Sequence, residues 1–385
     1  GHDHFFATFG KYGLVPGTHR DQTIADVATR AADENEVYVE TMFNLGKNVG
    51  SLADAISSGV ITPADLPALY TALTTNAGFA TAVTSDTAVL ASARSGYTDV
   101  LGCNDQGTPA ACDVTVRFIA QVSRTGASAQ VFGQLVSAFE MAKQSNLIVA
   151  ANLSSPEDDS ASIANYDLHM AMLDFLHTQY AGTSPLHVTL HAGELTAAFL
   201  PSGSPANTFH IRAAVETGHA ERIGHGIDLA TETDPAGLLA EMAAKQVLVE
   251  VCLSSNTQIL EVSGTAHPLA QYLAAGVPVA LATDDQGVSR SSMAGEYKRA
   301  ALDQHLDYRQ LKTLARNSLE HAFLPGPSLW STVAPFAPVP ACAATATMGI
   351  GDPPNTDCAA FLGTSERATI QWSLEHNFLV FESAQ

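Results

Sequence analysis

Basic residues are scarce in this sequence. Its 385 residues contain 18 Lys and Arg against 39 Asp and Glu, which gives a formal net charge of −21. Nucleic acids and anionic membranes are bound mainly through clusters of basic side chains. The composition therefore argues against both as partners and leaves a neutral small molecule open as a ligand.

Charged residues as a whole are also few, and long apolar runs are absent. Charged residues make up 15% and hydrophobic residues 46% of the chain, whereas ordinary globular proteins are roughly 25% charged. Disorder requires low hydrophobicity and high charge, so we expect an ordered chain with a large core. No run reaches the roughly 18 apolar residues of a transmembrane helix. The length suits two or three domains of about 150 residues, or one α/β barrel.

The five cysteines fall into two pairs and one single residue. Cys103 and Cys112 bracket a polar stretch with Gly and Pro, Cys342 and Cys358 bracket a second, and Cys252 lies in an apolar run. Two loop-closing disulfides and one buried thiol indicate an oxidising compartment, so we expect a secreted or periplasmic protein. Five reduced thiols in a cytosolic enzyme are the alternative.

Seven short β-branched runs alternate with helix-like segments such as 127–144, 159–180, 207–220 and 234–245. The apolar cores of these runs are nearly continuous, which is typical of strands buried on both faces of a parallel sheet. The alternation predicts βα units and hence a (β/α)8 TIM barrel. The predicted strands are 37–44, 114–124, 147–157, 188–194, 222–229, 247–256 and 277–287.

A closed barrel of this type needs eight strands. Nothing before residue 37 reads as a strand, because GHDHFFATFGKYG resembles the start of a helix. We expect the first strand to be absent from the 385 residues. The remainder is expected to form one domain, 1–385, with a helical insertion at 45–100, a disulfide-tied loop region at 326–364 and a closing helix at 365–382.

Polar motifs gather at the carboxyl ends of the predicted strands. His191 ends one strand in HAGE, where a neutral imidazole can bind a metal, and Glu194 follows as an acid or base. His225 lies between two glycines in GHG. Asp284 and Asp285 follow VPVALA, and two adjacent carboxylates repel each other unless a cation or proton separates them. A core histidine and a helix N-cap are the structural alternatives.

Together these strand ends favour a metal-assisted hydrolase. The sequence has no HExxH motif, no Walker loop and no GxSxG elbow. No lysine ends the strand LIVAANL, so a carbamylated lysine bridging two metals is not expected. One metal ion per chain fits better than two.

Four ordered motifs, TLHAGE, RIGHGIDL, EVCLSSN and ATDDQG, resemble those of the adenosine deaminase family of metal-dependent barrel hydrolases. The similarity covers about residues 110–325. Further stretches, HFFATFGKYG and LARNSLEHAFLPG among them, are similar to the secreted, growth-factor-like branch of the family and its bacterial relatives. That branch implies a homodimer.

The resemblance implies a role for each motif residue. His191 and Asp284 would be ligands of one Zn²⁺ ion. Glu194 would donate a proton to N1 of the purine, and His225 would orient the attacking water and help to deprotonate it. Asp285 would hydrogen-bond the purine N7.

Ser155 and Gly193 would complete the substrate site. Many relatives carry glycine at the position of Ser155, so the fit around the purine ring is expected to differ. A second departure concerns a His-x-His pair, which supplies two more zinc ligands on the family's first strand. His2 and His4 form such a pair here, but they precede a helix that in the family lies well downstream of the ligands.

The expected reaction is therefore zinc-dependent hydrolysis of adenosine or 2′-deoxyadenosine to the inosine product and ammonia. Two alternatives stay open: a deaminase of AMP or a modified adenosine, and a non-catalytic nucleoside-binding or signalling homologue with an incomplete metal site. The serines at 254 and 255 and Asn256 are expected to support the strand ends by hydrogen bonding.

Overall fold

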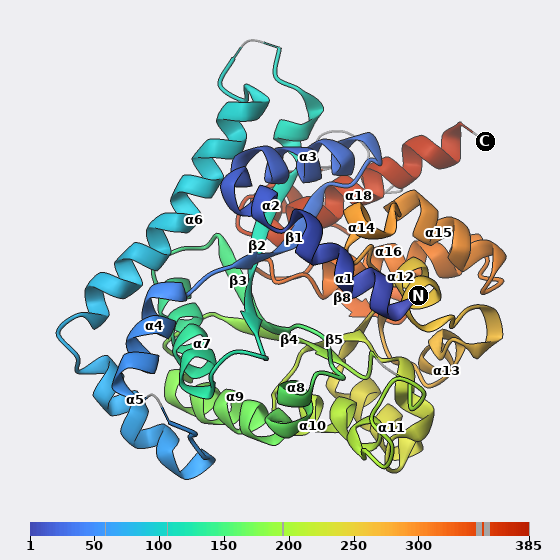
Figure 1. The fold of residues 1–385 in the computed structure, drawn as a ribbon. Helices are drawn as coiled ribbons and strands as arrows, with labels where there is room; N and C mark the ends of the chain where they lie inside the picture. The colour runs from blue at the N-terminus through green and yellow to red at the C-terminus, as the bar shows by residue number, and fades with distance from the viewer. Residues whose placement is uncertain (58, 106, 195, 344–348, 350–354, 385) are drawn as a thin grey trace.

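The structure is a computed structural model that describes residues 1–385 except 58, 106, 195, 344–348, 350–354 and 385. Its centre is a sheet of seven parallel strands that follow each other in chain order (Figure 1). All seven predicted strands are confirmed. They are β1 Tyr38–Asn44, β2 Thr115–Ser123, β3 Ile148–Ser154, β4 His187–Ala192, β5 Arg222–His225, β6 Leu248–Val251 and β7 Val279–Leu281.

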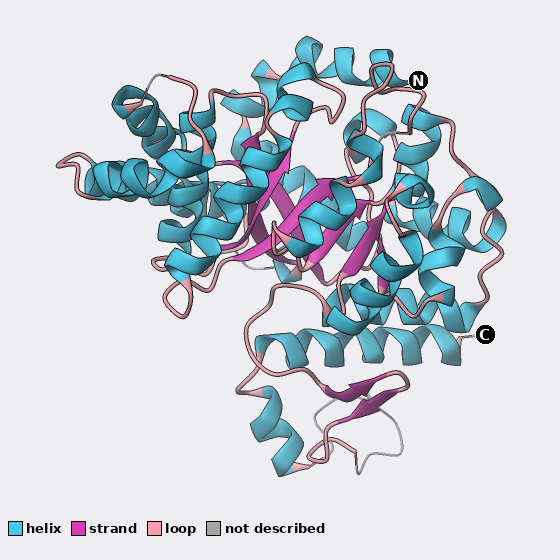
Figure 2. Ribbon diagram, turned by 90° about the horizontal axis from the view of Figure 1, so that it is seen from below, coloured by secondary structure: helices cyan, strands magenta, loops and turns pink. Residues whose placement is uncertain are grey.

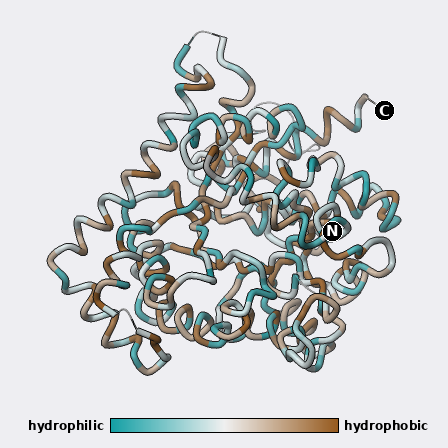
Figure 3. The backbone as a smooth tube through the Cα atoms, viewed as in Figure 1, coloured by the Kyte–Doolittle hydropathy of each residue, from teal (hydrophilic) through white to brown (hydrophobic). Residues whose placement is uncertain are grey.

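Helices surround this sheet, so the fold is an α/β barrel with seven of its strands present. The helices are α1 His2–Tyr12, α2 Leu14–Thr18, α3 Arg20–Asp33, α4 Lys47–Ile56, α5 Leu66–Thr74, α6 Phe79–Leu101, α7 Ser128–Ala142, α8 Ser160–Ala164, α9 Tyr166–Tyr180, α10 His210–Glu216, α11 Pro235–Lys245, α12 Leu253–Leu260, α13 Leu269–Ala274, α14 Gln286–Ser289, α15 Met293–Leu302, α16 Tyr308–Glu320, α17 Thr356–Leu362 and α18 Glu366–Ser383. In Figure 3 brown and teal stretches alternate along the outer helices, as expected for helices with one buried face.

Local sequence explains why several of the helices begin where they do. Ser292 at the start of α15 accepts a hydrogen bond from the backbone N–H of Gly295. Asp307 and Gln310 form a reciprocal capping box at the start of α16. Such caps satisfy backbone donors that have no partner within the helix and stabilise it by about 1 kcal/mol each.

The two ends of the sheet differ from its middle. All seven residues of β3 are buried, as its apolar sequence predicts, whereas six residues of β1 are half-buried and the seventh is exposed. Within the described residues the outer edges of β1 and β7 pair with no strand. Both strands line one cavity of about 1060 Å³, together with α16 and α18. We call this opening between β1 and β7 the slot.

The segment 45–100 is mostly helical and consists of α4, α5 and α6. In Figure 1 the long helix α6 runs along one side of the molecule. Helix α1, at the amino-terminal end of the described residues, packs against α12 and α14. Phe5, Phe6 and Phe9 of α1 line the cavity, so this helix covers the carboxyl ends of the strands.

Both predicted disulfides are present. One joins Cys103 and Cys112 and the other joins Cys342 and Cys358, while Cys252 is a free, buried thiol. The second lies beside an antiparallel hairpin of β8 Trp330–Val333 and β9 Phe336–Pro338. Figure 2 shows this hairpin apart from the main sheet. Part of the expected loop region 326–364 lies outside the described residues.

No helix in the described ranges is long and apolar enough to cross a membrane.

Candidate active site

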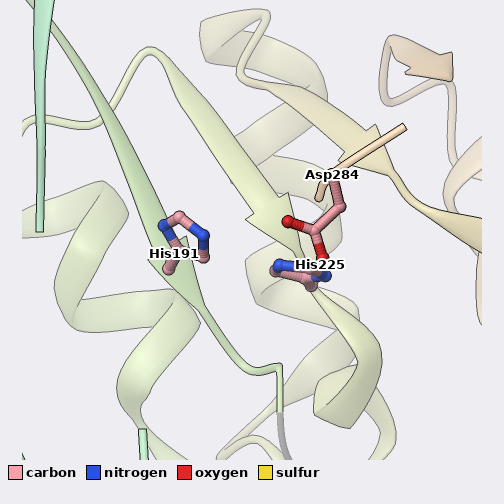
Figure 4. A group of neighbouring side chains, drawn as sticks. All are labelled: His191, His225 and Asp284. Carbon is pink, nitrogen blue, oxygen red and sulfur yellow. The ribbon is translucent and has the colours of Figure 1, made fainter. Parts of the chain in front are cut away.

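Three side chains from three strand ends lie together. His191 is on β4, His225 ends β5 and Asp284 follows β7. The carboxyl ends of parallel strands meet at one edge of the sheet, and the pairing of β4 with β5 places Ala192 opposite His225. The potential ligand atoms of the three residues lie within 4.8 Å of one another (Figure 4).

His191 is prepared to act as a metal ligand. Its Nδ1 lies 2.7 Å from Oδ1 of Asn152 on β3, so Nδ1 carries the proton and Nε2 keeps its lone pair. Burial, with contributions from His225 and Arg124, lowers the pKa of His191 to about 3. The ring is therefore neutral at ordinary pH, as metal binding requires.

Asp284 is held in place by a hydroxyl group. Ser255 Oγ donates to Asp284 Oδ2 at 2.6 Å, and the backbone of Asp284 has φ 52°. A neutral imidazole nitrogen and a carboxylate fit a zinc-type cation. Because a tetrahedral site needs four ligands, these two residues make up half of such a site. His2 is elsewhere, in the first turn of α1, where its ring stacks on Phe199.

Glu194 is the carboxyl group next to this cluster. It is 5% exposed and its Oε1 lies 3.7 Å from His225 Nε2. Burial raises the pKa of Glu194, and the carboxylate of Asp284 adds to this effect. Burial alone would lower the pKa of His225, but Glu194 and Asp284 outweigh it and raise this pKa. A raised pKa suits a carboxyl group to the role of a general acid.

A second buried glutamate fixes the turn that carries Glu194. Glu157 accepts hydrogen bonds from the backbone N–H groups of Gly193 at 3.0 Å and Glu194 at 2.7 Å. It also lies 2.6 Å from His210 Nδ1. Burial alone would raise the pKa of Glu157, but His210 and Arg124 outweigh it and hold this pKa at about 2.

Gly193 belongs to this turn and does not line the cavity. Its φ is 65°, and a Cβ atom here would lie 2.3 Å from Asp228 Oδ1 and 2.6 Å from Ile211 Cγ1. Since its N–H donates to Glu157, the glycine is explained by the turn. The expectation that Gly193 touches the substrate stays a prediction.

Asp285 and Ser155 both line the cavity. Asp285 precedes α14 but makes no capping hydrogen bond, so the N-cap alternative is not realised. Desolvation and the neighbouring Asp284 raise the pKa of Asp285 to about 8, and its carboxyl can donate a hydrogen bond at neutral pH. Ser155 has φ 93°, and its hydroxyl lies 2.8 Å from Ser123 Oγ.

Three further residues of the site, Asn152, Glu157 and His267, were not assigned to it from the sequence. Asn152 contacts His191, and Glu157 accepts from the backbone of Glu194. Asn256, expected to support a strand end by hydrogen bonding, contacts His225 Nδ1 and His267 Nε2. Asn152 lies within the apolar strand β3, and a buried amide there is a usable signal. Glu157 and His267 lie in connecting segments, where sequence alone indicates no partner.

We predict that Glu157→Gln destabilises the protein at neutral pH more than at acidic pH. A carboxyl group with a depressed pKa stabilises the fold above its unfolded value of 4.5, and the stabilisation is lost as the pH falls toward about 2. A difference of about 2.5 pKa units corresponds to about 3 kcal/mol. Denaturant unfolding of both proteins at pH 7 and pH 3 tests this: equal differences at the two pH values would contradict it.

Comparisons with known proteins agree with this geometry. The family profile described as adenosine deaminase matches residues 94–330, more than half of the chain. The chain is 38% identical to adenosine deaminase of Klebsiella pneumoniae strain 342 and 34% identical to that of Escherichia coli strain SMS-3-5, each over 149 residues. These alignments cover 38% of this chain and 41% of each relative, so less than half of each relative is matched.

Two solved structures can be compared with this fold. An amidohydrolase from Burkholderia ambifaria with bound Zn has a TM-score of 0.50 and 15% identity, covering 79% of this chain and 68% of that one. The adenine deaminase of Arthrobacter aurescens has a TM-score of 0.47 and 21% identity, covering 79% and 74%. The match of the family profile over more than half of the sequence is decisive: the chain belongs to the adenosine deaminase family.

Proposed function

We propose that this protein hydrolyses adenosine and 2′-deoxyadenosine to inosine and 2′-deoxyinosine with release of ammonia, using one Zn²⁺ ion. The observation that carries the proposal is the buried Glu194, whose pKa is raised, in the same cavity as His191 and Asp284. The relatives named adenosine deaminase support the same reaction.

His191 and Asp284 would hold the metal, which when bound lowers the pKa of water from about 16 toward 7 and so supplies hydroxide at neutral pH. The side chains account for the rest of the chemistry. Water adds across the C6–N1 bond: Glu194 gives its proton to N1, the oxygen goes to C6, and the proton released by the water restores that of Glu194. The amino group then leaves C6 as ammonia, taking the proton of the new C6 hydroxyl, and a carbonyl remains.

Two neighbours would orient the reactants. His225 lies within reach of Glu194 and would orient the attacking water. The purine N7 is a hydrogen-bond acceptor, so it requires a donor, and a protonated Asp285 supplies one. Ser155 would lie against the ring, where its side chain takes more room than glycine.

The test is to measure zinc content and the ultraviolet change on adding adenosine, with protein of known intact mass. We expect turnover that is lost on chelation and restored by zinc. Protein with stoichiometric zinc and no turnover would refute the enzymatic proposal.

The slot supports a second candidate, a nucleoside-binding homologue without catalysis. With only half of a tetrahedral site among the described residues, zinc binding would be weak. We propose instead that an eighth strand, not among the described strands, occupies the slot in the active protein and supplies the missing ligands. Binding of inosine with no deamination in zinc-saturated protein would favour the non-catalytic alternative.

We predict that adenosine is preferred over AMP in kcat/KM by about 100-fold or more. Among the described residues that line the cavity, Arg222 and Lys312 are the Lys or Arg side chains, and both are already paired: Arg222 with Glu40 and Glu250, Lys312 with Glu382. The described lining therefore offers a phosphate no unpaired Lys or Arg, while it contains carboxyl groups such as Glu34 and Glu36, and juxtaposed like charges cost several kcal/mol.

The matched control is 5′-O-methyladenosine, which adds bulk at the same position without charge. It should be turned over much better than AMP. Equal kcat/KM values for AMP and adenosine would exclude a nucleoside-specific cavity and favour the nucleotide alternative. Turnover of an N⁶-modified adenosine in the same assay tests the modified-nucleoside alternative.

The two disulfides support a secreted or periplasmic location, because such bonds persist in oxidising compartments. The resemblance to the growth-factor-like branch of the family supports a homodimer, which we propose as the assembly. Alkylation without reduction should leave Cys103, Cys112, Cys342 and Cys358 unlabelled, and sedimentation would give the oligomeric state.

A further inference from the structure

We propose that Asn256 and His267 are positioning residues that fix the tautomer of His225, with its proton on Nε2. The nitrogen of His225 that faces Glu194 then donates a hydrogen bond and does not accept one. The consequence for catalysis rests on the proposed function, but the tautomer itself does not.

The network begins at the main chain. The backbone N–H of Leu269 donates to His267 Nδ1 at 3.0 Å. A backbone N–H can only donate, so His267 Nδ1 must accept and carries no proton. His267 is 2% exposed, and burial, with the charge of His225, lowers its pKa to about 4. The ring is neutral, and its single proton is on Nε2.

The proton on His267 fixes the amide of Asn256. His267 Nε2 lies 3.2 Å from Asn256 Oδ1, so the amide oxygen accepts there. The amide nitrogen Nδ2 then lies 3.2 Å from His225 Nδ1 and donates to it. Asn256 is fully buried and His225 is 2% exposed, and reversing the amide would oppose two donors at His267 Nε2, with no water to relieve the clash.

His225 Nδ1 is therefore an acceptor, and its proton is on Nε2. Nε2 cannot bind a metal or remove a proton from water while it carries its own. This assigns His225 the role of a donor, which orients the attacking water, and removes the expectation that it helps to deprotonate that water.

The neighbouring imidazole has the opposite arrangement. His191 Nδ1 faces Asn152 Oδ1, an acceptor, and so carries the proton, which leaves the lone pair on Nε2. The two ring centroids are 5.3 Å apart. Two asparagines thus distinguish the two histidines: His191 can bind a cation, and His225 can donate a hydrogen bond.

The tautomer can be measured directly by nitrogen-15 NMR of histidine-labelled protein, as purified and after saturation with zinc. Protonated and unprotonated ring nitrogens give well-separated signals, and we expect His225 to show a protonated Nε2. In Asn256→Asp the carboxylate accepts from both neighbours, so the proton of His225 should move to Nδ1. We expect kcat to fall by about 100-fold or more, because the wrong nitrogen then faces the water, while KM changes little.

The matched control is Asn317→Asp, since Asn317 is also a buried amide but donates to the backbone carbonyl of Val279. It should leave the His225 signals in place. A protonated Nδ1 in the unmodified protein, or unchanged signals in Asn256→Asp, would overturn the proposal. The signals are read without turnover, so absence of deamination would count against the proposed function and not against the tautomer.

Discussion

Replacing Glu194 by glutamine lowers kcat by about 10²–10⁴-fold, the usual contribution of a positioned general acid or base. Glutamine has the same shape but cannot transfer a proton to N1. Because Glu194 is not a metal ligand, zinc content should not change. Steady-state kinetics with adenosine and metal analysis of the same samples give both quantities.

The control for this prediction is Glu232→Gln. Glu232 is a buried carboxyl group whose pKa is also raised by burial, but it accepts from the backbone of Ile211 and does not line the cavity. It should leave kcat unchanged. If Glu194→Gln retained full activity, another group would have to supply the proton, and the assignment of Glu194 would be wrong.

Replacing Asp284 by asparagine weakens zinc binding by more than about 100-fold. Loss of a residue that only hydrogen-bonds a metal ligand costs 10–100-fold in affinity, and loss of the ligand charge itself should cost more. The amide retains the hydrogen bond from Ser255, so local structure should survive. Competition with a chromophoric chelator measures the affinity, and activity should follow zinc occupancy.

Asp174→Asn is a matched control. The Asp174 carboxylate also lies close to an imidazole, 2.8 Å from His219 Nε2, but away from the cavity. Its zinc affinity should equal that of the unmodified protein. Unchanged affinity in Asp284→Asn would show that the metal, if bound, is held elsewhere.

The strands and the strand-end residues were predictable from sequence for one physical reason. A strand buried on both faces requires a continuous apolar run, so each of the seven runs identified its strand. Polar residues directly after such runs must lie at one edge of a parallel sheet. The pattern alone therefore predicts that His191, His225 and Asp284 lie close together.

The support of the site was not predictable in the same way. Glu157 reaches the turn of Glu194 from the segment after β3, and His267 reaches Asn256 from the segment before α13. No periodicity constrains such connections. The requirement for glycine at position 193 likewise depends on the side chains of Asp228 and Ile211, which a linear sequence does not place beside it.

The order of the strands has a consequence for how the chain folds. Every pairing in the sheet, from β1 with β2 to β6 with β7, joins strands that are consecutive in the sequence. Each pairing nevertheless spans a connection that contains at least one helix, from Tyr38 with Thr115 to Val249 with Val279, and the entropic cost of closing a connection grows with its length. In the eight-stranded form proposed above, joining β1 to β7 through the further strand would be the step with the largest sequence separation. We therefore expect the open sheet to assemble first and ring closure to follow as a slower, separable event.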